Sequence, residues 1–276
     1  MTPVERTLVV VVCLASFGCR SERPASHGDH PGTCSITPEP LRAGALTRTR
    51  TRVAEVLDFP ARGKDPAVHQ EALEEREDST TVVEASGAVA HRVNFEVSRH
   101  RLRMANGAMA PGPLDGLKAE LVIVDGAVVV HPFAGKIDDR AQTTLLDLHR
   151  HLGEPDPFIA LGPTSSAVGA RNAPYEAVLA RWMRRDRPDA SGHVPEVRAM
   201  LTRCDAASAT FSVSFRVIGH QLGWDLDGHL EGQLVLSRRH GRPTSVTLHT
   251  VATATAPDAD GKGSVRGDQS VENVYE

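Results

Sequence analysis

The sequence predicts an α+β fold: a mainly antiparallel β-sheet, arranged as a meander or a half-barrel, with two or three helices inserted mid-chain. Three observations support this class. Apolar and polar residues alternate in the first third of the chain and again in the last third, as in half-buried strands. Between these regions, apolar residues recur at helical spacing. The two β regions could therefore be halves of one sheet.

The first β region begins with clear alternation. Residues 47–59 read TRTRTRVAEVLDF and predict a strand. Residues 60–78 are polar and predict either a short helix or a loop. Strand-like sequence resumes at 80–85 and at 92–104.

A tight hairpin is the clearest local prediction. The segments LKAELVIV and AVVVHPF flank Asp125 and Gly126. Asp-Gly between two β-branched runs is typical of a two-residue turn, because both residues tolerate a positive φ. We expect two paired strands within residues 117–133.

Three helices are predicted in the middle of the chain. The first is capped by Asp138 or Asp139 and ends at Gly153, and the second begins with Pro174 as its first residue. The third covers residues 194–204. Their apolar stripes are, in turn, Ala141, Leu145, Leu148 and Leu152; Val178, Leu179, Trp182 and Met183; and Val194, Val197, Met200, Leu201 and Cys204.

The last third predicts a β-meander. Alternating runs cover residues 209–218, 226–236 and 245–255. Gly228 and Gly232 inside the second run suggest bulges. Residues 265–274 predict a short strand at the edge of the sheet.

The amino terminus carries an export signal. Residues 8–17 form an uncharged apolar run of about half the ~20 residues that a membrane-spanning helix needs. This length is typical of the core of a signal peptide, which is removed from the mature protein. We therefore assign residues 1–18 to a signal peptide and expect the rest to be exported.

Ser16, Phe17, Gly18 and Cys19 directly follow this run and resemble the lipobox of bacterial envelope lipoproteins. The resemblance implies cleavage after Gly18 and acylation of Cys19, with palmitate among its three chains. Stable anchoring needs more than one acyl chain. Arg20 after the cysteine implies sorting to the outer membrane, facing the periplasm or the cell surface. The alternative is an ordinary cleaved signal peptide and a secreted protein.

The composition divides the mature chain into a tether and one domain. Residues 19–40 are rich in proline and glycine and poor in large apolar residues, which favours a flexible tether. Residues 41–276 are expected to form a single β-rich domain. The formal net charge of −4 argues against general nucleic-acid binding, which depends on clustered positive charge.

Four cysteines limit the covalent options. Cys13 leaves with the signal peptide, and Cys19 is the lipidation site. Cys34 and Cys204 remain as an even pair in an oxidising compartment, so we predict a disulfide between them. The alternative is two unpaired thiols, with Cys204 as a small buried residue on a helix.

The candidate sites each have a simpler structural reading. His27, Asp29 and His30 with Cys34 resemble metal ligands but match no standard spacing. His149 and His151 lie two residues apart on a helix, so they point to different faces. We interpret them as polar residues on the exposed surface of the helix. We therefore assign no metal and no cofactor.

The remaining candidates also favour structural roles. Asp138 and Asp139 read as a helix cap rather than paired acid and base groups. Ser165 and Ser166 lack the Gly-x-Ser-x-Gly elbow and read as loop residues, and Trp224 reads as a core residue. A basic cluster ends the second helix and either contacts anionic headgroups or is simply solvated: Arg181, Arg184, Arg185 and Arg187.

These features together predict a non-catalytic, membrane-anchored envelope lipoprotein that binds a lipid, a peptide or another envelope protein. The layout resembles lipoproteins of unknown function from GC-rich bacteria and the half-barrel lipoprotein carriers. The alternatives are a secreted hydrolase of unknown substrate and a purely structural envelope protein. The sequence identifies no catalytic residue and no binding residue.

Overall fold

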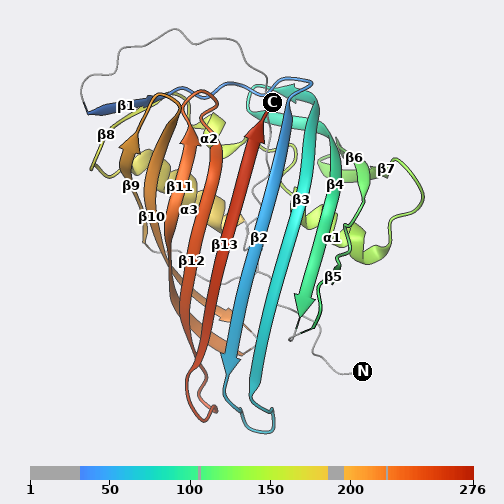
Figure 1. Cartoon of the computed structure of the whole chain (residues 1–276), viewed down its shortest axis with the longest axis vertical. Helices are drawn as coiled ribbons and strands as arrows, with labels where there is room; N and C mark the ends of the chain where they lie inside the picture. The colour runs from blue at the N-terminus through green and yellow to red at the C-terminus, as the bar shows by residue number, and fades with distance from the viewer. Residues whose placement is uncertain (1–31, 105–106, 186–195, 222) are drawn as a thin grey trace.

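The computed structural model describes residues 32–104, 107–185, 196–221 and 223–276. Within these ranges an 11-stranded antiparallel sheet dominates (Figure 1), with β5 beside β4 and the other strands in the order β7-β6-β4-β3-β2-β13-β12-β11-β10-β9. The strands are β2 (Leu46–Phe59), β3 (Val68–Ser86), β4 (Val89–Met104), β5 (Ala110–Pro111), β6 (Lys118–Val124), β7 (Ala127–Pro132), β9 (Val197–Cys204), β10 (Ser208–Gln221), β11 (Trp224–Ser237), β12 (Pro243–Thr255) and β13 (Gly263–Tyr275). The predicted fold class is confirmed.

The last strand joins the two β regions into one sheet. β13 pairs with β12 on one side and with β2 on the other, in a register that runs from Ser264 opposite Asp58 to Tyr275 opposite Thr47. Residues 265–274 therefore lie at the centre of the sheet, and the prediction of an edge strand was wrong. The reason is that a strand's own sequence does not record which distant strand pairs with its second edge.

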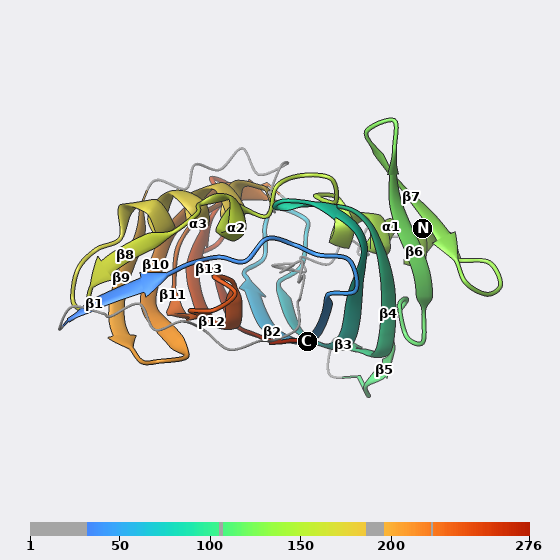
Figure 2. The ribbon, with the colours of Figure 1, turned by 90° about the horizontal axis from the view of Figure 1, so that it is seen from above.

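The sheet curves into an open half-barrel with the helices on its concave side (Figure 2). These helices are α1 (Asp139–His149), α2 (Pro157–Ala160) and α3 (Ala173–Arg185). Asp138 caps α1 by accepting a hydrogen bond from the Ala141 N–H at 2.8 Å, and α3 buries Val178 and Leu179, so both helix predictions are confirmed. Among the described residues, no helix is long and apolar enough to span a membrane.

Two separate apolar clusters form under the helices. The first lies between β9–β12 and α3 and includes Phe211, Phe215 and Leu234. The second lies between β4, β6 and α1 and includes Phe95, Leu121 and Leu145. The short helix α2 links them, because Phe158 belongs to the first cluster and its neighbour Ile159 to the second.

Two segments predicted as helix or loop are strands. Residues 68–78 belong to β3, whose alternate positions Glu74, Arg76 and Asp78 are buried; since these residues are charged, the alternation is invisible to an apolar count. Residues 197–204 form β9 rather than a helix, with Ala199 and Leu201 buried. Its apolar residues fit a helical spacing equally well, and pairing with β10 decides between the two.

The predicted hairpin is confirmed, whereas the predicted bulges are not. Asp125 (φ 52°) and Gly126 (φ 79°) form the turn between β6 and β7. β11 pairs with β12 without a shift at Gly228 or Gly232. Gly232 is instead required by close packing, because a Cβ there would lie 1.8 Å from the Thr247 carbonyl oxygen.

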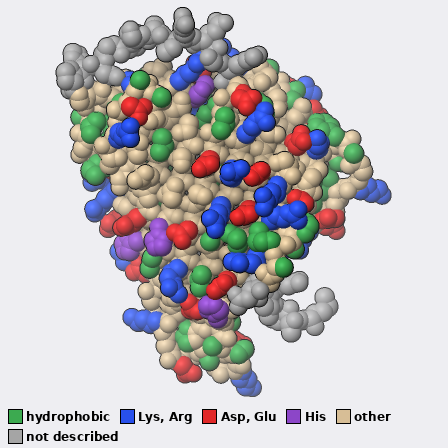
Figure 3. All heavy atoms as spheres, in the orientation of Figure 1, with side chains coloured by type: hydrophobic (Ala, Val, Ile, Leu, Met, Phe, Trp, Pro, Cys, Tyr) green, Lys and Arg blue, Asp and Glu red, His purple; other side chains and the backbone are tan. Residues whose placement is uncertain are grey.

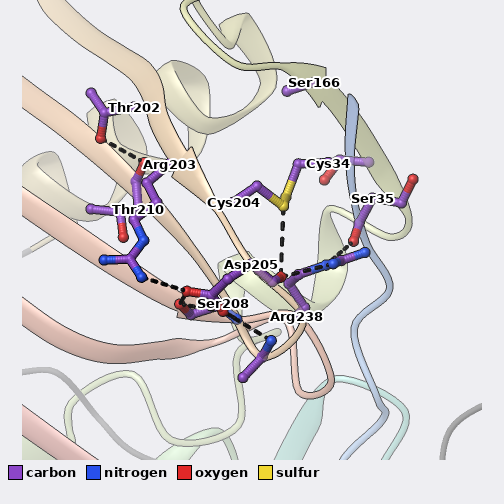
Figure 4. The surroundings of a disulfide bond; sticks show 12 residues. Cys34, Ser35, Ser166, Thr202, Arg203, Cys204, Asp205, Ser208, Thr210 and Arg238 are labelled. Carbon is purple, nitrogen blue, oxygen red and sulfur yellow. Dashed lines mark hydrogen bonds and ion pairs between the residues drawn. A yellow bond between two sulfur atoms is a disulfide. The ribbon is translucent and has the colours of Figure 1, made fainter. Parts of the chain in front are cut away.

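A disulfide joins Cys34 to Cys204, with the two Cα atoms 5.9 Å apart (Figure 4). Cys34 lies in β1 (Thr33–Ile36), which pairs with β8 (Thr164–Ala167), and Cys204 ends β9. The Arg238 side chain donates to the carbonyls of Ser35 and Asp205, on either side of the bond. Within the predicted tether of residues 19–40, Thr33–Ile36 form a strand in which Cys34 and Ile36 are buried.

The convex face of the sheet carries scattered charged side chains of both signs among uncharged ones (Figure 3). Arg48 pairs with Glu276 at 2.8 Å, and Arg50 pairs with Glu77 at 3.0 Å. These side chains are exposed, so water screens the pairs and they add little stability. A face of this composition is suited to water.

Removing the disulfide should destabilise the domain. The bond joins residues 170 positions apart, and closing so long a loop restricts the unfolded chain by about 5 kcal/mol in the chain-entropy relation. We expect the double variant Cys34→Ser/Cys204→Ser to lose about 3–5 kcal/mol of unfolding free energy in a urea titration. Reductant should lower the stability of the wild type and leave the variant unchanged; equal sensitivity would contradict a native disulfide.

Candidate functional site

A band of buried polar residues runs along the concave face between the two apolar clusters. It lies on the central strands β13, β2 and β3, and we call it the polar midline. Its members are the buried polar side chains Thr47, Thr49, Thr51, Glu55, Glu74, Arg76, Asp78, Thr80, Gln269 and Asn273. In β2 the buried positions alternate with exposed Arg48, Arg50 and Arg52, so the strand separates an inner polar face from an outer charged one.

Three alternate residues of β3 form a buried ionic group. The Arg76 side chain lies 2.8 Å from Asp78 (Nε to Oδ2) and 3.5 Å from Glu74 (Nη1 to Oε1). All three side chains are less than one-tenth exposed. Burial raises the pKa of Asp78 although Arg76 opposes it. Burial also acts to raise the pKa of Glu74, but His100 and Arg76 outweigh it and hold that pKa below its ordinary value.

His100 on β4 extends this group. Its Nδ1 accepts a hydrogen bond from the Leu114 N–H at 3.2 Å, so the proton of the neutral ring lies on Nε2. Nε2 is 3.4 Å from Glu74 Oε1. Gly112 packs against the ring so closely that a Cβ there would lie 2.5 Å from Nδ1. The glycine therefore allows the histidine to reach the carboxylate.

His149 covers the ionic group from the end of α1. Its ring is 4% exposed and meets Phe95 edge-on, with 4.5 Å between ring centroids. Within the described ranges, neither ring nitrogen has a hydrogen-bond partner. Burial, helped by the charge of Arg76, lowers the pKa of His149 to about 3. The prediction that His149 is an exposed polar residue was wrong, because the last turn of α1 faces the sheet.

A second buried cation lies at the end of the midline where β2 begins and β13 ends. Arg242, just before β12, is 3% exposed and stacks over the Tyr275 ring at 4.4 Å. Its Nε and Nη1 have no hydrogen-bond partner in the described part of the chain, and the same holds for Oγ1 of Thr47, which is opposite Tyr275 in register. Asp156 caps α2 close by, and burial raises its pKa although Arg242 opposes the shift.

The midline is therefore rich in buried groups that can hydrogen-bond. An unsatisfied buried donor or acceptor costs about 1–3 kcal/mol, so such groups call for a partner. Arg242, Thr47 and His149 offer unused donors and acceptors between two apolar walls. A polar group placed among these atoms would supply the missing hydrogen bonds. The described residues contain no group of three side chains suited to a metal ion.

The candidate residues named from sequence are not brought together. Cys19, His27, Asp29 and His30 lie outside the described residues, and Cys34 is engaged in the disulfide. His151 pairs with Glu154 at 3.2 Å, away from any shared site with His149.

The remaining named residues have structural positions. Ser165 and Ser166 lie in β8, not in a loop, and the Asn172 amide donates to Ser166 Oγ. Trp224 is buried and stacks on Phe59 with 5.1 Å between centroids. Of the basic cluster, Arg181 is exposed, Arg187 lies outside the described residues, and only the backbone of Arg184 and Arg185 is described.

A pocket of about 420 Å³ opens elsewhere, at the start of α1. Lys118, Lys136 and the half-exposed Phe133 line it. It lies at the β6–β7 end of the sheet, separate from the polar midline.

Comparisons with known proteins do not identify a family. No family model matches the chain, and no curated protein matches it by sequence. Among solved structures, lipovitellin, studied for its lipid–protein interactions, aligns over 85% of this chain and 26% of its own with a TM-score of 0.38 and 9% identity. An outer membrane channel from Pseudomonas putida F1 aligns over 86% of this chain and 97% of its own, with a TM-score of 0.23 and 9% identity. The chain thus spans about a quarter of the length of lipovitellin.

Arg76 should be far more important for stability than its neighbour on the convex face. Arg76→Leu leaves two buried carboxyl groups without their cation, which costs about 3–5 kcal/mol of unfolding free energy. Arg50→Leu removes an exposed pair and should cost less than about 1 kcal/mol. Replacing Glu74, Arg76 and Asp78 together by leucine should recover most of the loss in urea titrations. Equal losses in the two single variants would refute a buried ionic role.

His149 should make the domain sensitive to acid. Its pKa is about 3 in the folded state against 6.5 in the unfolded chain, so the unfolded chain binds one more proton between these values. The contribution of His149 to the unfolding free energy is then fully present above pH 6.5. It falls by about 1.4 kcal/mol per pH unit as the pH drops toward 3. His149→Phe keeps the ring contact and should remove this component. Parallel pH profiles of unfolding free energy for the two proteins would contradict the assignment.

Proposed function

We propose that the chain is a non-catalytic lipoprotein of the bacterial envelope, anchored through acylated Cys19, whose half-barrel binds an amphiphilic molecule along the polar midline. The observation that supports a bound ligand is the buried side chain of Arg242. This residue is 3% exposed, and its guanidinium keeps two nitrogens without a hydrogen-bond partner in the described residues.

A carboxylate or phosphate group would accept hydrogen bonds from the two unpartnered nitrogens of Arg242. Nε and one Nη of a guanidinium match two oxygens of such a group, and charge-assisted bonds of this kind are the strong ones. Thr47 Oγ1 adds a further unused group on β2. The anionic end of an amphiphile therefore suits this end of the midline.

The apolar part of the ligand would contact the clusters on either side. Binding sites for small molecules are mostly apolar, with a few polar groups that fix orientation. α2 is only four residues long, and it contributes Phe158 to one cluster and Ile159 to the other. Displacement of α2 from the sheet would expose both clusters next to Arg242, which gives the ligand a route of entry.

The envelope location rests on separate support. The short apolar run before Cys19 fits an exported lipoprotein, and Arg20 fits sorting to the outer membrane. A disulfide between Cys34 and Cys204 fits an oxidising compartment. The charged convex face fits exposure to water outside the membrane.

Ligand titration of the full-length protein, purified from membranes and freed of bound lipid, tests the proposal. A fluorescent fatty acid should bind the wild type and bind Arg242→Gln about 10–100-fold more weakly, because 1.5–3 kcal/mol of charge-assisted bonding is lost. Arg216→Gln is the matched control. Arg216 forms an exposed ion pair with Asp227 at 3.0 Å, so the affinity for the fatty acid should stay unchanged.

A fatty alcohol of equal length should bind weakly and respond little to Arg242→Gln, because it lacks the anionic group. Thermal unfolding of both variants checks that they are folded. Absence of binding to the wild type, or equal losses in the two variants, would refute the amphiphile site and favour a purely structural protein.

A further inference from the structure

The point where the chain leaves the described domain is fixed to one edge of the sheet. The Gly32 carbonyl accepts a hydrogen bond from the Val168 N–H at 3.0 Å, and Thr33 is opposite Ala167 in the β1–β8 register. Two residues on, Cys34 is covalently joined to Cys204 of β9. The exit is thus held by hydrogen bonds on one side and a covalent bond on the other.

The covalent distance from this exit to the lipidation site is short. Gly32 follows Cys19 by thirteen residues, which span at most about 45 Å when fully extended. β3 alone, with 19 residues, is about 60 Å long. An anchor at Cys19 therefore keeps the exit edge closer to the bilayer than the length of the domain itself.

Around the exit lies a group of exposed residues that we call the exit patch. It consists of Val168, Arg171, Arg198, Met200 and Arg203. The loop after β8 is attached to the edge of β9, because the Gly169 N–H donates to the Leu201 carbonyl at 2.7 Å and Arg171 bridges to Met200. These contacts bring the five residues to one edge.

The patch combines apolar side chains with outward cations. Val168 is 47% exposed and Met200 is 41% exposed. The three arginine side chains are 65–76% exposed, and their acidic partners Glu176, Glu196 and Asp205 are each less exposed than the arginine they pair with. The three pairs carry no net charge, and in each pair the guanidinium is the more accessible partner.

We propose that the exit patch rests on the surface of the anchoring bilayer, with the arginines at anionic headgroups and Val168 and Met200 in the interface. This inference rests on the proposed anchoring at Cys19. Cations near an anionic surface are attracted to its headgroups, and the short tether raises the local concentration of the surface. The hairpin between β2 and β3, at the opposite end of the long strands (Figure 1), then points away from the membrane.

Amide exchange of the full-length acylated protein tests this orientation. The probe membrane is a vesicle of phosphatidylethanolamine and phosphatidylglycerol, compared with phosphatidylcholine vesicles. On the anionic vesicles, residues 168–171 and 197–203 should exchange about tenfold more slowly, the factor that 1.4 kcal/mol of local protection gives. Arg198→Glu/Arg203→Glu should abolish this slowing, whereas Arg50→Glu/Arg52→Glu on exposed positions of β2 should preserve it.

The possible results separate the two proposals. Acyl chains on the intact protein but absent from Cys19→Ser, measured by mass, together with equal exchange of the patch on both vesicles, would refute the patch and leave the anchor standing. Acyl chains missing from the wild type would refute the anchor itself. Slowing that persists in Arg198→Glu/Arg203→Glu would assign the protection to another cause and overturn the role of the arginines.

Discussion

The structure depends on the pairing of β13 with β2, which joins strands from the two ends of the chain. This ladder turns two β regions into one curved sheet, and every residue of the polar midline lies on it or on the adjoining β3. Without it, the apolar cluster under α1 and the one under α3 would be cores of separate halves. The paired residues are distant in sequence, so β13 can pair with β2 only after most of the chain has been made.

The same ladder explains why the midline is polar. The inward positions of the central strands lie between the two clusters, where the four-residue α2 contributes one residue to each core. Threonine, asparagine and paired charges can remain hydrogen-bonded at such positions, as Thr49 and Asn273 do at 3.1 Å. Because moving the charges out of water offsets much of their mutual attraction, the ionic group by itself is weak evidence for stability.

Much of the fold could be predicted from the sequence, and little of the site. The Asp125–Gly126 hairpin, the Asp138 cap and the meander of β10–β12 all depend on local patterns, which a sequence records directly. The first half of β3 was missed because its buried face carries Glu74, Arg76 and Asp78, which mimic a surface segment, whereas the strand at residues 80–85 was predicted. Arg242 and His149 were missed because their burial depends on segments more than thirty residues away. Residues 74–78 are charged on both faces of the strand, so the sequence carries no signal of which face is buried.

The two proposals place opposite demands on arginine. On the exit patch, exposed guanidinium groups beside less exposed acids stay solvated, so they can exchange water for headgroups at little cost. Arg242 has already lost its water, and its nitrogens gain strongly from any anion that reaches them. The first kind of site binds a surface weakly and reversibly, whereas the second holds a single group tightly. The proposed anchor and the proposed amphiphile site therefore call for two different arginine environments, one solvated and one buried.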